Sequence, residues 1–125
     1  MSELRLDPTT REWVIIATER ARRPRDFVPP LVRTVPEAYV ADCPFCPGNE
    51  GMTSGESLAY IDAATGGWRV RAFANKYPAV APDGDARRVQ DHPLALSMRG
   101  VGFHEVVVES PVHNRFLAQM TDEEI

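Results

Sequence analysis

The stretch Trp68-Arg69-Val70-Arg71-Ala72-Phe73 alternates along its length, so that its first, third and fifth side chains share one face. An alternation with a period of two is typical of a β-strand. Residues 56–61 form a second, weaker strand pattern, and the small residues at 62–67 signal a turn between the two stretches. The sequence therefore predicts a β-hairpin, which makes an antiparallel sheet the starting point for the fold.

Two further stretches have the composition of strands. Trp13-Val14-Ile15-Ile16-Ala17 is aromatic and β-branched and follows the turn signal Asp7-Pro8-Thr9-Thr10, so we expect a short buried strand there. Residues 103–110 contain three consecutive valines and end at Pro111, a residue that cannot donate a hydrogen bond to a neighbouring strand. This second stretch has the strongest strand pattern in the chain.

Two other segments give different signals. Residues 78–100 have no clear period and are rich in Asp, Arg, Pro and Gly, so the sequence predicts a long loop. Thr121-Asp122-Glu123-Glu124 has the pattern of a capping box, with acidic residues where the helix dipole favours them. Because Ile125 is the last residue, we expect a chain truncated at the start of a helix; a frayed natural terminus is the alternative.

Both cysteines of the chain lie in Cys43-Pro44-Phe45-Cys46-Pro47-Gly48-Asn49. Two intervening residues let both sulfur atoms of one turn face a single ion, which is half of a tetrahedral zinc site, and His92, His104 and His113 are available to complete it. A thioredoxin-like redox pair is an alternative, although its βαβ context is missing. A structural disulfide is another, although its ring would be small and nothing indicates secretion.

Composition excludes several classes of protein. The chain has 125 residues, 43% of them hydrophobic, which suits one soluble domain with a core. Its 14 basic and 18 acidic residues give a net charge of −4, which argues against a nucleic-acid partner but leaves room for a small phosphorylated ligand. We find no signal peptide and no apolar stretch of the roughly 18 residues that a transmembrane helix needs. We therefore expect no membrane association and a reducing, cytoplasmic location.

Five collinear stretches together resemble the N-terminal half of the galactose-1-phosphate uridylyltransferase family, a nucleotidyltransferase branch of the histidine-triad superfamily. They cover almost the whole chain in order, so they are far more specific together than any one of them alone. The last stretch is also very similar to ADP-sugar phosphorylase relatives of the family. The five stretches are Leu6-Asp7-Pro8 with Arg11-Glu12-Trp13-Val14-Ile15, Arg20-Ala21-Arg22-Arg23-Pro24, Cys43 to Asn49, Phe73-Ala74-Asn75-Lys76-Tyr77-Pro78, and Gly102 to His113.

The resemblance implies a zinc ligand set. Zinc-binding members of the family use the paired cysteines and the histidine after Ser-Pro-x, which correspond here to Cys43, Cys46 and His113. His113 follows a strand-ending proline and can turn toward a neighbouring loop, whereas His104 shares a strand face with valines and is expected to pack. His92 is expected to be exposed in the predicted loop. The fourth ligand of the family has no counterpart in the chain and is expected beyond its last residue.

The resemblance also implies substrate-binding residues. Arg20 and Arg23 are expected near the phosphates of a sugar nucleotide, since guanidinium groups match phosphate oxygens; a solvated basic face is the alternative. Phe73 and Asn75 are expected to hold the base and the ribose, and the alternative for Phe73 is a core residue at a strand end. Lys76 departs from relatives that have an acidic residue there.

The chemistry of the family needs a His-x-His motif, and no such motif occurs in these 125 residues. We therefore expect the chain to be the N-terminal part of a nucleotidyltransferase domain, inactive by itself because the nucleophilic histidine is missing. The resemblance implies a complete enzyme that transfers UMP between UDP-glucose and a hexose 1-phosphate in galactose metabolism. It also implies a homodimer and an α+β fold, histidine-triad-like, with an antiparallel sheet and few helices in this half. An ADP-sugar or dinucleotide phosphorylase and a non-catalytic zinc-stabilised module are the alternatives.

Overall fold

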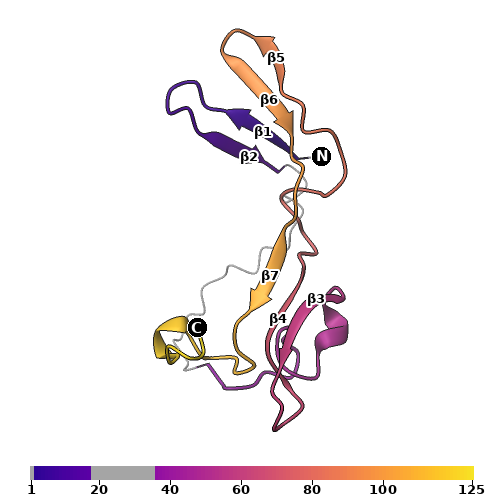
Figure 1. The fold of residues 1–125 in the computed structure, drawn as a ribbon, viewed down its shortest axis with the longest axis vertical. Coiled ribbons are helices and arrows are strands. Elements are labelled where there is room, and N and C mark those ends of the chain that lie inside the picture. The colour runs from indigo at the N-terminus through magenta and orange to yellow at the C-terminus, as the bar shows by residue number, and fades with distance from the viewer. Residues whose placement is uncertain (1, 18–35) are drawn as a thin grey trace. The chain divides into compact units, whose positions relative to one another are not determined.

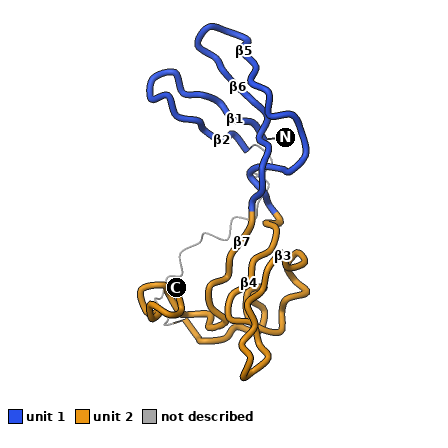
Figure 2. Tube along the Cα trace, viewed as in Figure 1, with its two compact units in different colours: residues 1–26, 77–104 blue, residues 27–76, 105–125 orange. Residues whose placement is uncertain are grey.

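A computed structural model describes residues 2–17 and 36–125 of the chain. Its backbone forms two compact units, one built from residues 1–26 and 77–104 and the other from residues 27–76 and 105–125 (Figure 2). Each unit contains one antiparallel sheet (Figure 1). Over the described residues, no helix is both long enough and apolar enough to cross a lipid bilayer.

The first unit holds a four-stranded sheet with the strand order β2-β1-β6-β5, and each neighbouring pair is antiparallel. The predicted turn before β2 is confirmed: the Asp7 carboxylate accepts hydrogen bonds from the backbone N–H groups of Thr9 and Thr10 and from the Thr9 hydroxyl. These bonds lower the pKa of the Asp7 carboxyl, and the bond from the Thr9 hydroxyl has the largest effect. The strands are β1 (Glu3–Leu6), β2 (Trp13–Ile16), β5 (Val89–His92) and β6 (Ala95–Arg99).

Two predictions for this unit are wrong. The strand at 13–17 exists but is not buried, because β2 is an edge strand and Val14 and Ile15 each keep 47% of their surface exposed. The predicted loop at 78–100 contains the hairpin of β5 and β6. Every residue of β5 is exposed, so this strand is held by backbone pairing with β6. A strand with no buried face needs no apolar alternation, and its sequence therefore has none.

The second unit confirms the predicted hairpin. Strands β3 (Glu56–Ile61) and β4 (Trp68–Ala74) pair antiparallel, and β7 (Glu105–Val108) pairs with the other edge of β4. The turn between β3 and β4 is held by the Asp62 carboxylate, which accepts from the backbone N–H groups of Ala64 and Thr65 at 2.8 and 3.0 Å. Strand β4 is therefore the central strand of this sheet.

Strand β7 is shorter than the predicted strand at 103–110, and His104 lies just before its first residue. The structure assigns His104 to the first unit, where its Nδ1 accepts a hydrogen bond from the backbone N–H of Ala79 at 2.8 Å. Ala79 is buried, so its N–H needs an acceptor inside the protein. The His104 ring therefore serves as a hydrogen-bond acceptor for a buried N–H, and its predicted packing role stays a prediction.

The antiparallel sheets with few helices are confirmed, whereas the helical part of the predicted α+β class is not seen over the described residues. Their only helices are the single-turn 3₁₀ segments η2 (Glu50–Met52) and η3 (Leu117–Gln119). At the predicted helix start, Glu124 Oε2 accepts from the Thr121 backbone N–H at 2.9 Å, which is one half of a capping box. The segment makes one turn there.

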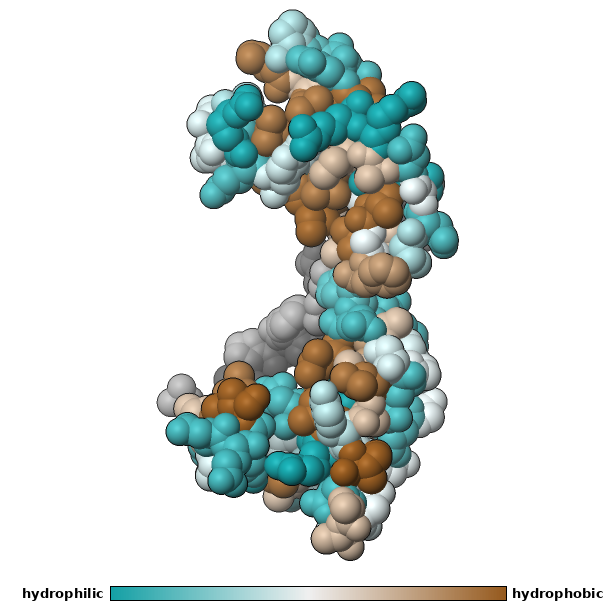
Figure 3. Space-filling model, in the orientation of Figure 1, coloured by the Kyte–Doolittle hydropathy of each residue, from teal (hydrophilic) through white to brown (hydrophobic). Residues whose placement is uncertain are grey.

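The core of the second unit lies where β4 meets the cysteine-containing segment. Phe73 is 3% exposed and its ring stacks on that of Phe45, with 6.2 Å between the ring centroids. Several large apolar side chains elsewhere in the unit, including Tyr60 on β3, are more than half exposed. Figure 3 accordingly shows brown, apolar residues scattered among teal, polar ones over the visible face of each unit.

We predict that Phe73→Ala lowers the free energy of unfolding by about 3–5 kcal/mol, because it empties a buried aromatic site against Phe45. Tyr60→Ala, at a side chain 61% exposed in the same sheet, is the control and should cost below about 1 kcal/mol. Urea unfolding followed by tryptophan fluorescence measures both. Equal losses in the two variants would contradict the assignment of Phe73 to the core.

Candidate metal centre

Two consecutive tight turns shape the segment from Cys43 to Asn49, which we call the cysteine turn. The Cys46 N–H donates to the Cys43 carbonyl and the Asn49 N–H donates to the Cys46 carbonyl, each at 3.2 Å. Each turn has a proline at its second position, where the fixed φ angle of proline fits. Gly48 is the third residue of the second turn and has a φ of +91°. A type II turn needs a positive φ at this position, and glycine adopts it most readily.

Backbone N–H groups point at both sulfur atoms of the cysteine turn. The Phe45 N–H donates to Cys43 Sγ and the Val40 N–H donates to Cys46 Sγ, both at 3.4 Å. Such donors favour the thiolate form, which is the form that binds metals. Cys46 is buried, and this burial raises the pKa of its thiol although the Val40 N–H opposes the shift. A buried thiol of this kind is a good metal ligand when an ion replaces its proton.

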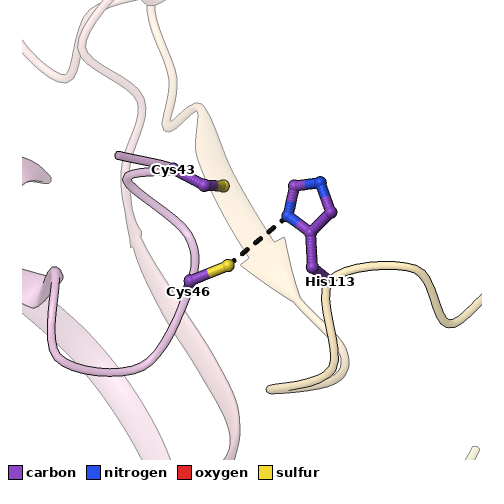
Figure 4. A group of neighbouring side chains, drawn as sticks. All are labelled: Cys43, Cys46 and His113. Carbon is purple, nitrogen blue, oxygen red and sulfur yellow. Dashed lines mark hydrogen bonds between the residues drawn. The ribbon is translucent and has the colours of Figure 1, made fainter. Parts of the chain in front are cut away.

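His113 completes a group of three ligand atoms. Its Nδ1 lies 3.4 Å from Cys46 Sγ, and the ligand atoms of Cys43, Cys46 and His113 all lie within 4.8 Å of one another. Figure 4 shows the two sulfur atoms and the imidazole ring turned toward the same space. Around tetrahedral zinc, bonds of about 2.0–2.3 Å place neighbouring ligand atoms about 3.4–3.8 Å apart. The three donors therefore suit zinc in their chemistry, and the distance between Cys46 Sγ and His113 Nδ1 matches its ligand spacing.

The loop that carries His113 is held in place by the segment preceding the cysteine turn. The His113 N–H donates to the Ala38 carbonyl and the Asn114 side-chain amide donates to the Pro36 carbonyl, both at 2.8 Å. A cavity of about 300 Å³ between this loop, strand β7 and the cysteine turn is lined by all three ligands. A fourth ligand can therefore reach the metal position through this cavity.

Sequence reasoning missed the residues that support the cysteine turn. The side-chain amide of Asn49 donates to the carbonyls of Ala41 and Cys43, at 2.9 and 2.8 Å. The Glu50 carboxylate accepts from the Gly48 N–H at 3.0 Å and from the indole N–H of Trp68 at 2.8 Å, so it ties the turn to β4. An Asn directly after Pro-Gly is a signal for the contacts of Asn49, whereas no local pattern indicates the contacts of Glu50.

The structure brings the three predicted metal ligands together, and it describes only two of the four predicted substrate residues. Arg20 and Arg23 lie outside the described residues. Phe73 is buried near the end of β4, as a core residue would be, and Asn75 is half-buried just after that strand. The roles of these four residues in substrate binding stay predictions.

We predict that replacing Cys43 or Cys46 with Ser, or His113 with Ala, weakens zinc binding by at least about 100-fold. Loss of an outer-shell partner alone already costs about 10–100-fold in affinity. His92→Ala, at an exposed position on β5, is the matched control and should keep the wild-type affinity. Competition with a chromophoric chelator measures the affinity and elemental analysis the stoichiometry. Unchanged binding after loss of either thiol would refute this ligand set.

A second prediction concerns pH. The N–H groups of Glu50 itself, of Gly48 and of Trp68 lower the pKa of the Glu50 carboxyl below its ordinary 4.5. Stability from this carboxylate is therefore present above about pH 4.5 and is lost as the pH falls through the lowered value. Glu50→Gln should be less stable than the wild type at pH 7, with a difference that shrinks below pH 4.5. Thermal unfolding between about pH 3 and 7 measures the effect, with Glu123→Gln as the exposed control. A stability difference between Glu50→Gln and the wild type that stays constant over this range would contradict the prediction.

Comparison with known proteins confirms the resemblance derived from the sequence. The model of the family "Galactose-1-phosphate uridyl transferase, N-terminal domain" matches residues 1–125. ADP-glucose phosphorylase of Arabidopsis thaliana is 37% identical over 113 residues, which are 90% of this chain and 32% of the relative. Galactose-1-phosphate uridylyltransferase of Rattus norvegicus is 30% identical over 124 residues, which are 98% of this chain and 31% of the relative.

Among solved structures, the Arabidopsis ADP-glucose phosphorylase with bound ADP-glucose aligns with 96% of this chain and 32% of its own, at 32% identity and a TM-score of 0.46. The chain spans about a third of the length of the curated relatives that it matches. Because the family model covers every residue of the chain, the chain belongs to the galactose-1-phosphate uridylyltransferase family and matches its N-terminal domain.

Proposed function

We propose that this chain is the metal-holding and nucleotide-binding part of a UDP-glucose–hexose-1-phosphate uridylyltransferase, an enzyme of galactose metabolism that moves UMP between sugar 1-phosphates. The observation that carries the proposal is the family match over residues 1–125, together with the convergence of Cys43, Cys46 and His113. Members of this family are nucleotidyltransferases and phosphorylases, so a nucleotide sugar and a sugar phosphate are the proposed partners. We place the enzyme in the cytoplasm, where free thiols persist.

Zinc is the proposed metal. Two cysteine sulfurs and one imidazole nitrogen are the donors that zinc prefers, and the three come from one tight turn and one loop. A bound zinc ion would supply charge compensation for the thiolates and would cross-link the cysteine turn to the loop after β7. The buried position of Cys46 favours this use, because a metal-bound thiolate is stabilised without contact to bulk water.

The proposed reaction divides between this chain and the rest of the protein. A double displacement through a nucleotidyl-histidine needs a nucleophile beside a second histidine, and the 125 residues contain no His-x-His. We therefore place the nucleophile in another part of the full-length protein, which we propose to be a homodimer. Arg20 and Arg23 hold the phosphates in this proposal, and Phe73 and Asn75 support the nucleoside side of the site.

Phosphorolysis of an ADP-sugar is the second candidate function. The higher identity to the Arabidopsis ADP-glucose phosphorylase, 37% against 30% for the rat uridylyltransferase, favours it. In that reaction inorganic phosphate replaces the hexose 1-phosphate as the acceptor of the nucleotidyl group, so the two functions share the same metal and phosphate-binding residues. They differ in the base that is recognised and in the acceptor.

Assays of the full-length protein decide between the two functions. We expect transfer of UMP from UDP-glucose to galactose 1-phosphate, and little release of ADP from ADP-glucose with inorganic phosphate. The reverse pattern would establish the second candidate and overturn the first. If neither pair of substrates reacts while zinc is bound, a zinc-stabilised module without catalytic activity becomes the supported function.

We further predict that Arg23→Ala raises KM for the nucleotide sugar by about tenfold, which corresponds to about 1.4 kcal/mol of lost binding. A guanidinium group that contacts a phosphate through charged hydrogen bonds accounts for a loss of this size. Arg22→Ala is the matched control, since it removes the same charge one position earlier in the chain. Equal effects of the two substitutions would indicate a general charge effect and would remove Arg23 from the proposed site.

A further inference from the structure

Arg71 is the least expected residue in the core of the second unit. It lies on the central strand β4, between Val70 and Ala72, and its side chain is 0% exposed. Arginine is seldom fully buried, because removing its charge from water is unfavourable unless hydrogen bonds and opposite charges replace the water. The contacts that replace water around Arg71 therefore indicate why an arginine is present at this position.

The guanidinium group of Arg71 reaches into the cysteine turn. Its Nη2 donates to the carbonyl of Pro44 at 2.9 Å, and Pro44 lies between the two cysteines. Its Nη1 donates to Thr53 Oγ1 at 3.2 Å and lies 3.6 Å from a carboxylate oxygen of Glu56. One side chain thus joins the cysteine turn, the segment after it and strand β3.

Aromatic rings and an unpaired atom show what determines the orientation of this group. The guanidinium carbon lies 5.3 Å from the ring centroid of Trp68 and 4.8 Å from that of Phe73. The Nε atom of Arg71 is buried and has no hydrogen-bond partner among the described residues. Buried donors are usually paired, and Nε of Arg71 is an exception. The hydrogen bonds of Nη1 and Nη2 and the contacts with the two rings therefore account for the orientation of the guanidinium group.

We propose that Arg71 is the positioning residue of the metal centre. Its bond to the Pro44 carbonyl, together with the bond of Asn49 to the Cys43 carbonyl, fixes the backbone between the two cysteines, so that their sulfur atoms lie at ligand spacing before a metal binds. This inference rests on the proposed metal function of Cys43, Cys46 and His113. Lysine cannot replace Arg71, because an ammonium group lacks the planar fork that reaches Pro44 and Thr53 together.

The test measures metal binding rather than catalysis. We expect Arg71→Met and Arg71→Lys each to weaken zinc and cobalt binding by about 10–100-fold, as loss of an outer-shell partner typically does. The visible absorption of the cobalt-loaded protein should also change, since it reports the geometry around the ion. Arg69→Met is the matched control, because Arg69 lies on the same strand with its side chain exposed, and its binding and spectrum should be those of the wild type.

The outcomes separate this inference from the metal function itself. A wild-type protein that binds neither ion overturns both proposals. A wild-type protein that binds zinc, with folded Arg71 variants of unchanged affinity and spectrum, overturns only the role of Arg71. A purely structural role would lower the unfolding temperature of the metal-free protein without changing the affinity of the folded protein. If Arg71→Met does not fold, as judged by circular dichroism, Arg71→Lys decides the question by the same affinity criterion.

Discussion

The contact between Cys46 Sγ and His113 Nδ1 joins two positions that are 67 residues apart in the chain. Ordering so long an intervening segment is entropically unfavourable, although the penalty grows only slowly with length. The sheet of the second unit already orders much of this segment without a metal. Strand β7 pairs with β4 through Ala72 and Val107, and His113 follows only a few residues after β7 ends. In the proposed metal centre, an ion would therefore bind donors that the sheet has already brought together.

Polar contacts join several parts of this second unit to one another. Its described core contains few fully buried apolar side chains, among them Phe73 and Cys46, and the most buried residue is an arginine. Small cores of this kind commonly need a metal or another cross-link to reach adequate stability. Arg71, Asn49 and Glu50 connect the cysteine turn to its surroundings, and the metal centre would close the remaining side. Stability and ligand geometry therefore depend on the same contacts.

The three histidines of the chain occupy three different environments. His92 lies on an exposed edge strand, His104 accepts a hydrogen bond from a backbone N–H, and His113 faces two thiols. None of the three has a second histidine two residues away in the sequence. In the proposed function, this chain would hold the metal and the nucleotide sugar, and another part of the protein would supply the reacting group. The function of such a protein has to be argued from its complete site and not from the fold of one part of the chain.

The sequence by itself determined the features whose signal is local. The β3–β4 hairpin followed from alternation and turn residues, and the cysteine turn from the spacing of its two cysteines. His113 was identified through the family resemblance, and the fold then placed it beside the cysteines. The tertiary structure alone decided the rest. Strand β5 has little apolar alternation because backbone pairing at a sheet edge creates it, and a buried N–H 25 residues away is the hydrogen-bond donor to His104. Arg71 is another case, since an alternating strand pattern assigns an arginine to the solvent face, and only the fold shows that the cysteine turn covers it and accepts its hydrogen bond.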